Sequence, residues 1–149
     1  GDKRQSWIGI SQVSNLPWLG RISPFLLPIA GSEFDAHVST AANVMRLDGC
    51  SLLVFNGAKR IEVEGKVTNR WGVFLGLLNG EGQMFDWTAT PIITPPEGVE
   101  PGPHGQQIAF ASDASLRHLA KGIYELTVFY HAQDRFCCKW VGRVTLGGS

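Results

Sequence analysis

The chain has 149 residues, 44% of them hydrophobic and 17% charged, and its 13 basic and 13 acidic residues give a formal net charge of zero. This length suits one domain with a substantial core, and the balanced, interspersed charges exclude the basic arm or stripe of a protein that packages nucleic acid. Eighteen glycines and eight prolines favour short strands and tight turns over helices.

Residues 1–31 predict a Pro-rich arm or an edge strand. The stretch 16–31, LPWLGRISPFLLPIAG, contains three prolines and Arg21, and proline cannot donate to a central ladder. The stretch is also too short and too interrupted to cross a membrane, so we expect no membrane insertion. Trp7 and Trp18 lie in or beside this arm. They indicate a partner surface if they are exposed, and the alternative is that the arm folds over the end of the domain.

Residues 32–67 predict successive short strands. In 32–39, Phe34 begins a row of alternate apolar residues, as in a strand with one buried face. The apolar run 50–56 ends at Asn56-Gly57, a strong turn dipeptide. After this turn the alternation places two sets of residues on opposite sides: Ile61, Val63 and Val67 on one, and Arg60, Glu62, Glu64 and Lys66 on the solvated other.

The run 70–78 is apolar on both faces and ends at a second turn dipeptide, Asn79-Gly80. A strand of this kind needs cover on both sides. We expect one face to meet a second sheet and the other to meet a subunit or a covering loop. Residues 82–89 then predict a further strand of the same meander.

Residues 90–106 hold five prolines and three glycines, which predicts a long, stiff, exposed loop. A loop of this length inside a compact domain is usually functional or disordered. The possible partner or ligand surface predicted from the sequence combines residues of this loop with tryptophans elsewhere: Trp7, Trp18, Trp71, Pro95, Pro96 and His104.

After a strand at 106–112, the segment 112–122, SDASLRHLAKG, predicts one or two helical turns. Ser112 or Asp113 would be the N-cap, and Gly122 would lie just past the end. This short helix near residues 113–120 is the only helix that the sequence predicts.

The clearest pattern is a hairpin at 122–146. Alternate residues in 124–132 and 136–146 are mostly apolar, which gives each strand one buried face, and Gln133, Asp134 and Arg135 form a polar connection. A lone hairpin cannot bury these rows, so a second sheet must cover them. The sequence therefore predicts an all-β fold, a jelly-roll-like antiparallel β-sandwich, as a single domain over residues 1–149.

The sequence predicts no catalytic, cofactor or metal site. The histidines at positions 37, 104, 118 and 131 lie at no metal-ligand spacing with one another or with a cysteine. Cys137 and Cys138 lie in a strand, away from any helix N-terminus that would lower a thiol pKa, so packing is favoured over nucleophilic chemistry. Together with Cys50 they form no disulfide framework, which favours folding in a reducing compartment. A calcium site is an open alternative that the spacing does not predict, with these carboxylates: Glu33, Asp35, Asp86 and Asp134.

The segment 119–132, LAKGIYELTVFYHA, resembles a penultimate core strand of jelly-roll sandwiches. Such strands occur in small viral coat or spike domains and in tumour-necrosis-factor and C1q-like modules. The resemblance implies a protruding or spike domain of a viral capsid, folded in the host cytoplasm and displayed on the virion. It would self-associate as a dimer or trimer and present loops to a host receptor or glycan, with no enzymatic activity and no nucleic-acid partner.

Two alternatives stay open. One is a C1q-like or lectin-like module that binds a glycan or a protein through loop residues such as Trp18, Asp86 and His104. The other is an enzyme on a sandwich or cupin-like barrel, which needs His37, His104 and His131 to point into one pocket.

Overall fold

A computed structural model describes residues 6–7, 28–40, 44–98, 100–133 and 135–146. Within these ranges every helix or strand is a β-strand, which confirms the all-β class. Trp18 and Asp134 lie outside the described residues, and for Trp7 only the backbone is described.

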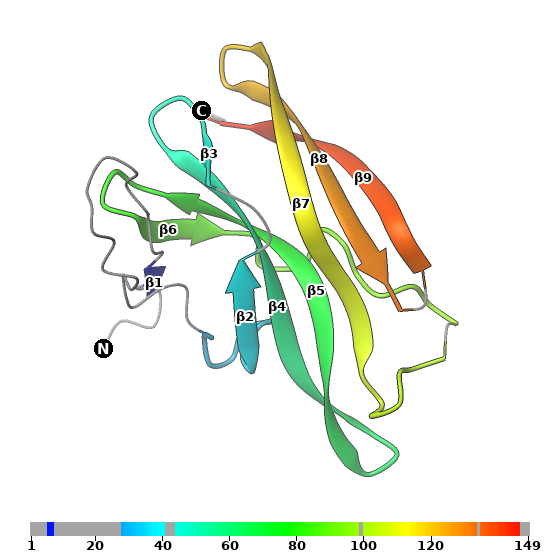
Figure 1. Ribbon diagram of the computed structural model, residues 1–149. Coiled ribbons are helices and arrows are strands. Elements are labelled where there is room, and N and C mark those ends of the chain that lie inside the picture. The colour runs from blue at the N-terminus through cyan, green and yellow to red at the C-terminus, as the bar shows by residue number, and fades with distance from the viewer. Residues whose placement is uncertain (1–5, 8–27, 41–43, 99, 134, 147–149) are drawn as a thin grey trace, which may run out of the picture.

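The strands of the described chain form two antiparallel meanders (Figure 1). Their bounds are β1 Ser6–Trp7, β2 His37–Thr40, β3 Met45–Arg46, β4 Ser51–Val63, β5 Lys66–Leu78, β6 Gln83–Trp87, β7 Gln107–Ala120, β8 Ile123–Ala132 and β9 Arg135–Thr145. In the first meander β4 pairs with β2, β3 and β5, β5 pairs with β6, and β6 pairs with β1. The second is β7–β8–β9. The long strands of each meander pair with their neighbours along the chain, whereas a jelly roll is built of Greek keys. The described strands therefore share the all-β class with a jelly roll.

The two meanders are joined at one edge of β5. A short parallel ladder pairs Arg70 and Trp71 of β5 with Gln107 and Ile108 of β7. The far end of the same edge pairs with β6. Between them, the segment 88–93 follows β5, and the Ile92 N–H donates to the Val73 carbonyl at 2.7 Å. This edge of β5 is therefore covered by three separate segments.

The segment 88–93 corrects the predicted exposed loop at 90–106. Ile93 and Pro95 are buried, and the Val73 N–H donates to the Ile93 carbonyl at 3.0 Å. Gly72 permits this close approach, because a Cβ at its position would lie 2.8 Å from the Pro91 Cβ. Thr94 and much of the later part of the loop, including Glu97 and His104, are exposed.

The hydrophobic core has two clusters, one on each face of β4–β5. The first combines residues of β4 and β5, such as Val54 and Val73, with inward residues of β7 and β8, such as Leu126 and Val128. This arrangement is consistent with a sandwich and confirms that the apolar row of the 122–146 hairpin is covered.

The second cluster covers the opposite face of β4–β5 with residues of the same chain. The Phe34 ring lies edge-on to Phe55 and Phe74, with centroids 5.2 and 5.1 Å apart, and it is fully buried. Gly57 makes room for it, since a Cβ there would lie 2.5 Å from the Phe34 Cβ. The second face of the run 70–78 is therefore covered by a segment of its own chain. Of the two covers expected from the sequence, a subunit or a loop, the structure shows the loop.

The predicted turn at Asn56-Gly57 is wrong, because both residues lie inside β4 and are buried. The turn comes at Glu64 and Gly65, which have φ angles of 51° and 78°, and Val63 pairs with Lys66 across it. A two-residue turn puts Val67 on the face opposite Ile61 and Val63. Val67 is accordingly 67% exposed, which corrects the predicted shared face.

The short helix predicted at 112–122 does not form. Residues 107–120 form β7, which pairs with β8 over its length with irregularities near Ser112 and Leu119. Ala114 and Leu116 pack on the core while Asp113 and Arg117 are exposed, a period of two that suits a strand. Pairing with β8 outweighs the local capping signal.

Candidate functional site

A shallow pocket lies where the 91–95 segment passes β4 and β5. It has room for about one water molecule. Its lining residues come from four segments: Glu33, Lys59, Arg70, Trp71, Gly72, Phe74, Pro91 and Pro95. Two residues of the predicted partner surface, Trp71 and Pro95, therefore border the same pocket.

The rim of the pocket carries two cations directly opposite each other. Lys59 and Arg70 are cross-strand partners in the β4–β5 ladder. Lys59 donates a hydrogen bond to Glu33, and this bond together with the Glu33 charge raises the pKa of Lys59. Among the residues that the structure describes, no carboxylate lies within ion-pair distance of Arg70. The rim therefore has one neutralised cation and one that is available to a ligand.

On the other face of β5, Trp71 belongs to a row of four aromatic rings. Successive ring centroids in the row His37, Trp71, Phe110 and His131 lie 6.0, 5.3 and 5.7 Å apart. The row crosses from β2 to β8 beside the short ladder that joins the meanders. Side chains alternate along a strand, so the Trp71 ring and the Arg70 guanidinium point to opposite faces. The ring row holds the two meanders together and leaves His37 exposed.

A polar cluster, formed by Asp48, His118 and Tyr124, ties the turn before β4 to the β7–β8 end. The Asp48 N–H donates to Tyr124 Oη at 2.8 Å. His118 Nε2 lies 3.9 Å from Asp48 Oδ2, and its ring stacks on Tyr124 at 4.6 Å. Burial raises the pKa of Tyr124. Sequence reasoning missed this cluster, because its partners lie about 70 residues apart and share no motif.

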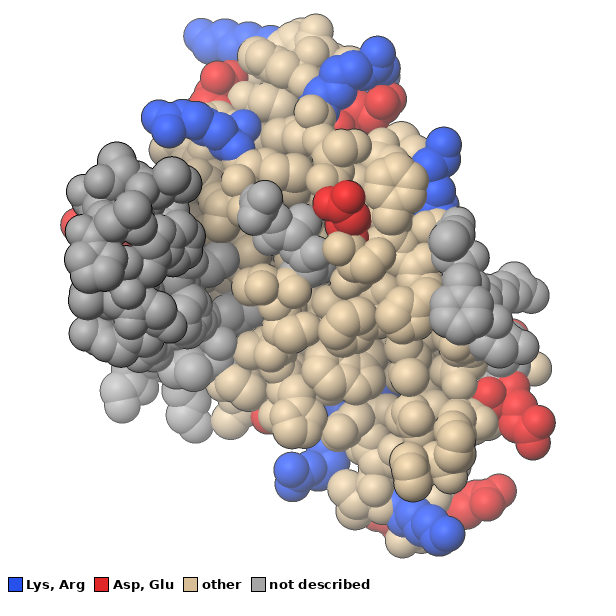
Figure 2. All heavy atoms as spheres, in the orientation of Figure 1, with Lys and Arg blue, Asp and Glu red and all other residues tan. Residues whose placement is uncertain are grey.

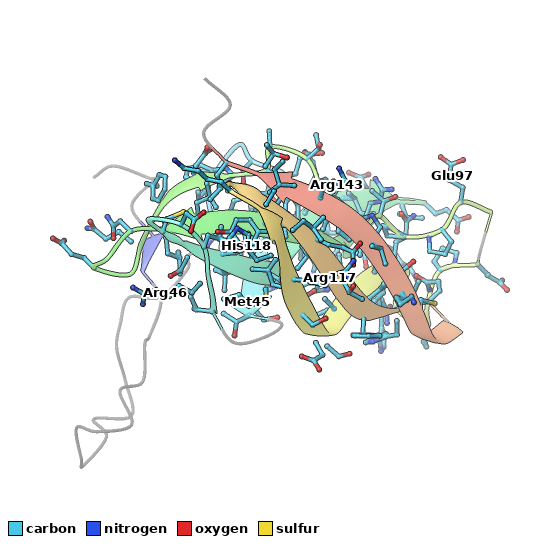
Figure 3. The ribbon with its side chains drawn as sticks, turned by 90° about the horizontal axis from the view of Figure 1, so that it is seen from above. Met45, Arg46, Glu97, Arg117, His118 and Arg143 are labelled. Atoms are coloured by element: carbon cyan, nitrogen blue, oxygen red, sulfur yellow. The ribbon has the colours of Figure 1, made fainter. Side chains whose placement is uncertain are left out.

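The outer face of β7–β8–β9 carries an ion pair and exposed apolar residues. Arg117 lies 3.3 Å from Glu125. Arg143 is the cross-strand neighbour of Glu125 in the β8–β9 ladder, and Figure 3 shows both arginines on this sheet. Phe129 and Val141, on the same face, are 40% and 50% exposed. Figure 2 shows that positive and negative side chains lie side by side at the upper and lower ends of the face in view, and that its middle carries few charges.

Of the predicted surface residues whose side chains the structure describes, Pro96 and His104 do not line the pocket. Pro96 is half-buried and His104 is exposed. His104 is held through its backbone, since its carbonyl accepts from Thr68 Oγ1 at 2.9 Å and its N–H donates to Gln106 Oε1 at 2.9 Å. Over the described ranges, no three His, Cys, Asp or Glu residues come together as metal ligands.

Cys50 and Cys138 are free and half-buried. Cys50 packs at the margin of the first core cluster, and burial raises the pKa of its thiol. Cys138 faces Tyr130 across the β8–β9 ladder. The Cys50 environment fits a packing role, since a reactive thiol needs a lowered pKa.

Comparisons of the chain with protein-family models, with curated proteins and with solved structures find no match. No helix long and apolar enough to cross a membrane occurs in the part of the chain that the structure describes.

Proposed function

We propose that this chain is a surface domain of a virion, of the protruding or spike kind, which self-associates and presents loops to a host molecule. The resemblance of residues 119–132 to a jelly-roll core strand supports the viral part of this proposal. The exposed apolar pair Phe129 and Val141 supports self-association and is the observation that carries the proposal.

Phe129 and Val141 lie close together on the outer face of the second meander. Thr127 pairs with Val141 in the β8–β9 ladder, so Phe129, two residues further along, is its diagonal neighbour on the same face. The opposite face of this sheet is already packed in the core. Among the described strands, β9 pairs with β8 alone, and an unpaired edge is a natural place for a second copy to bind.

Simple energetics predict weak association. Fully burying one exposed side chain of this kind contributes about 1.5–3 kcal/mol. Phe129 and Val141 are only 40% and 50% exposed, so each would contribute roughly half of that, and a symmetric dimer would bury four. Association of two proteins costs roughly 4–15 kcal/mol in lost freedom. The patch therefore favours an oligomer that forms at high local concentration, as on a particle surface.

Sedimentation velocity over a concentration series tests self-association. We expect a reversible shift to dimer or trimer that Phe129→Ser with Val141→Ser abolishes. Val67→Ser is the matched control, because Val67 is exposed at the distant β4–β5 turn and its replacement should leave the oligomer unchanged. A strict monomer at the highest soluble concentration would contradict the proposal.

A second function, a binding module for a glycan or a protein, is supported by the Arg70 pocket. A glycan array and a panel of host proteins, probed with the natural chain and with Arg70→Gln, test this function. Binding that depends on Arg70 without any self-association would favour this second function over the first.

A further inference from the structure

We infer that Arg70 and the pocket beside it form a docking point for a carboxylate supplied by a protein partner. The inference deepens the proposed recognition function by naming the chemistry of the partner. It does not depend on self-association, since the Arg70 pocket and the Phe129–Val141 patch involve different residues.

Two like charges lie opposite each other beside the pocket. Lys59 and Arg70 face each other directly across β4 and β5, and like charges in this position destabilise a sheet. A carboxylate placed between them would relieve the repulsion. Glu33 does so for Lys59. Asp35 adds a weaker attraction to Lys59, whereas no carboxylate of the described residues lies within ion-pair distance of Arg70. The Arg70 charge is therefore the one that an anion can neutralise.

Glu33 also shows which anion suits the site. It comes from the segment that crosses the sheet to insert Phe34, and it reaches Lys59 with its side-chain carboxylate. A peptide carboxylate therefore already binds one cation of this pair. The second cation, Arg70, offers a planar guanidinium whose paired N–H donors match the two oxygens of a carboxylate.

The pocket beside Arg70 limits the size of the bound group. Pro91, Pro95 and Gly72 bring the loop close to β5, and the remaining space holds about one water molecule. One carboxylate oxygen fits this space. The chain's own Glu97, on the same loop, is exposed and points away from the sheet in Figure 3.

Amide and Arg Nε chemical shifts, followed by NMR at constant ionic strength, test the carboxylate site. Sodium acetate should cause saturable shifts at Arg70 and Gly72, and sodium chloride should not. Arg70→Gln should weaken acetate binding by about tenfold or more. Arg60→Gln, a change at an exposed arginine of β4 outside the pocket, should leave it unchanged. Equal shifts with chloride, or acetate binding that survives Arg70→Gln, would overturn the inference.

A second comparison identifies the source of the carboxylate. A short Glu-containing peptide should bind more tightly than acetate and compete with it, and its Gln counterpart should not bind. Glucuronate that binds more tightly than the Glu peptide would overturn the protein partner in favour of an acidic sugar. The acetate and peptide titrations can both be carried out on a monomeric protein. A failure of self-association is therefore a separate result from a failure of carboxylate binding.

Discussion

Asn56 of β4 and Ala111 of β7 are joined by a pair of hydrogen bonds that resembles a strand ladder. The Asn56 Nδ2 donates to the Ala111 carbonyl at 3.1 Å, and its Oδ1 accepts from the Ala111 N–H at 2.7 Å. The Asn56 side chain is fully buried. The Asn56 side-chain amide therefore makes the two hydrogen bonds to the edge of β7 that a neighbouring strand would make. They lie beside an irregularity in the β7–β8 ladder.

Replacing Asn56 by leucine should lower the free energy of unfolding by about 2–5 kcal/mol, because it leaves a buried N–H and a buried carbonyl without partners. Asn56→Asp should also be destabilising, since it keeps the acceptor, loses the donor and buries a charge. Urea unfolding measures both effects. Asn69→Leu, at a half-buried position of β5, is the control and should change stability by less than about 1 kcal/mol. Equal losses at positions 56 and 69 would refute this role for Asn56.

Gly57→Ala should destabilise the fold by about 1–3 kcal/mol through overpacking. The added Cβ would lie 2.5 Å from the Phe34 Cβ and 2.8 Å from the Phe74 ring. Gly80→Ala provides the matched control, because a Cβ there meets nothing within 4 Å. Thermal unfolding of the two variants gives the comparison. A neutral Gly57→Ala would mean that Phe34 does not pack against β4 as described.

Phe34→Ala should cost about 3–5 kcal/mol and expose the second core cluster. The fluorescence of a hydrophobic dye should therefore rise under native conditions. Phe85→Ala removes a phenylalanine that is 49% exposed on β6, and it should have a much smaller effect on both measurements. Dye binding that stays unchanged in Phe34→Ala would show that another segment covers this face.

The sequence correctly indicated the parts of the fold in which the local hydrophobic pattern and the contacts with distant strands favour the same structure. The 122–146 hairpin was predicted from its alternating apolar residues. Those residues, such as Leu126 and Val128, are also the ones that are buried in the structure. The two-faced run 70–78 correctly required cover on both sides. In such segments the hydrophobic pattern and the strand pairing point to the same structure.

The errors arose where a local signal was overruled by distant contacts. Asn56-Gly57 has the composition of a turn, but Asn56 forms hydrogen bonds with Ala111, and Gly57 leaves room for the Phe34 side chain. Both partners are far away in sequence, so the dipeptide alone could not reveal them. The charged residues of the Arg70 pocket were missed for the same reason, since Lys59 and Arg70 meet through strand register and Glu33 reaches Lys59 from the segment before β2.

Alkaline pH should destabilise the protein partly through Tyr124. Burial raises its pKa above the ordinary value of 10.0, so the folded state holds the phenolic proton more tightly than the unfolded chain does. This stabilisation is complete below pH 10 and is lost as the pH rises through the folded-state pKa. Tyr124→Phe should therefore flatten the fall in melting temperature between about pH 9 and 11. A fall in Tyr124→Phe that is identical to that of the natural chain would contradict the assignment to Tyr124.

Glu64→Asn should stabilise the β4–β5 turn. Glu64 and Gly65 both have positive φ angles, 51° and 78°, and asparagine tolerates this conformation better than glutamate does. The gain should be about 0.5–1 kcal/mol in the free energy of unfolding. The same substitution at Glu62, an exposed residue inside β4, should instead be neutral or slightly destabilising, because asparagine is unfavourable in strands. A gain at position 62 that equals the gain at position 64 would point to a general charge effect, and the left-handed backbone at Glu64 would then not be the cause.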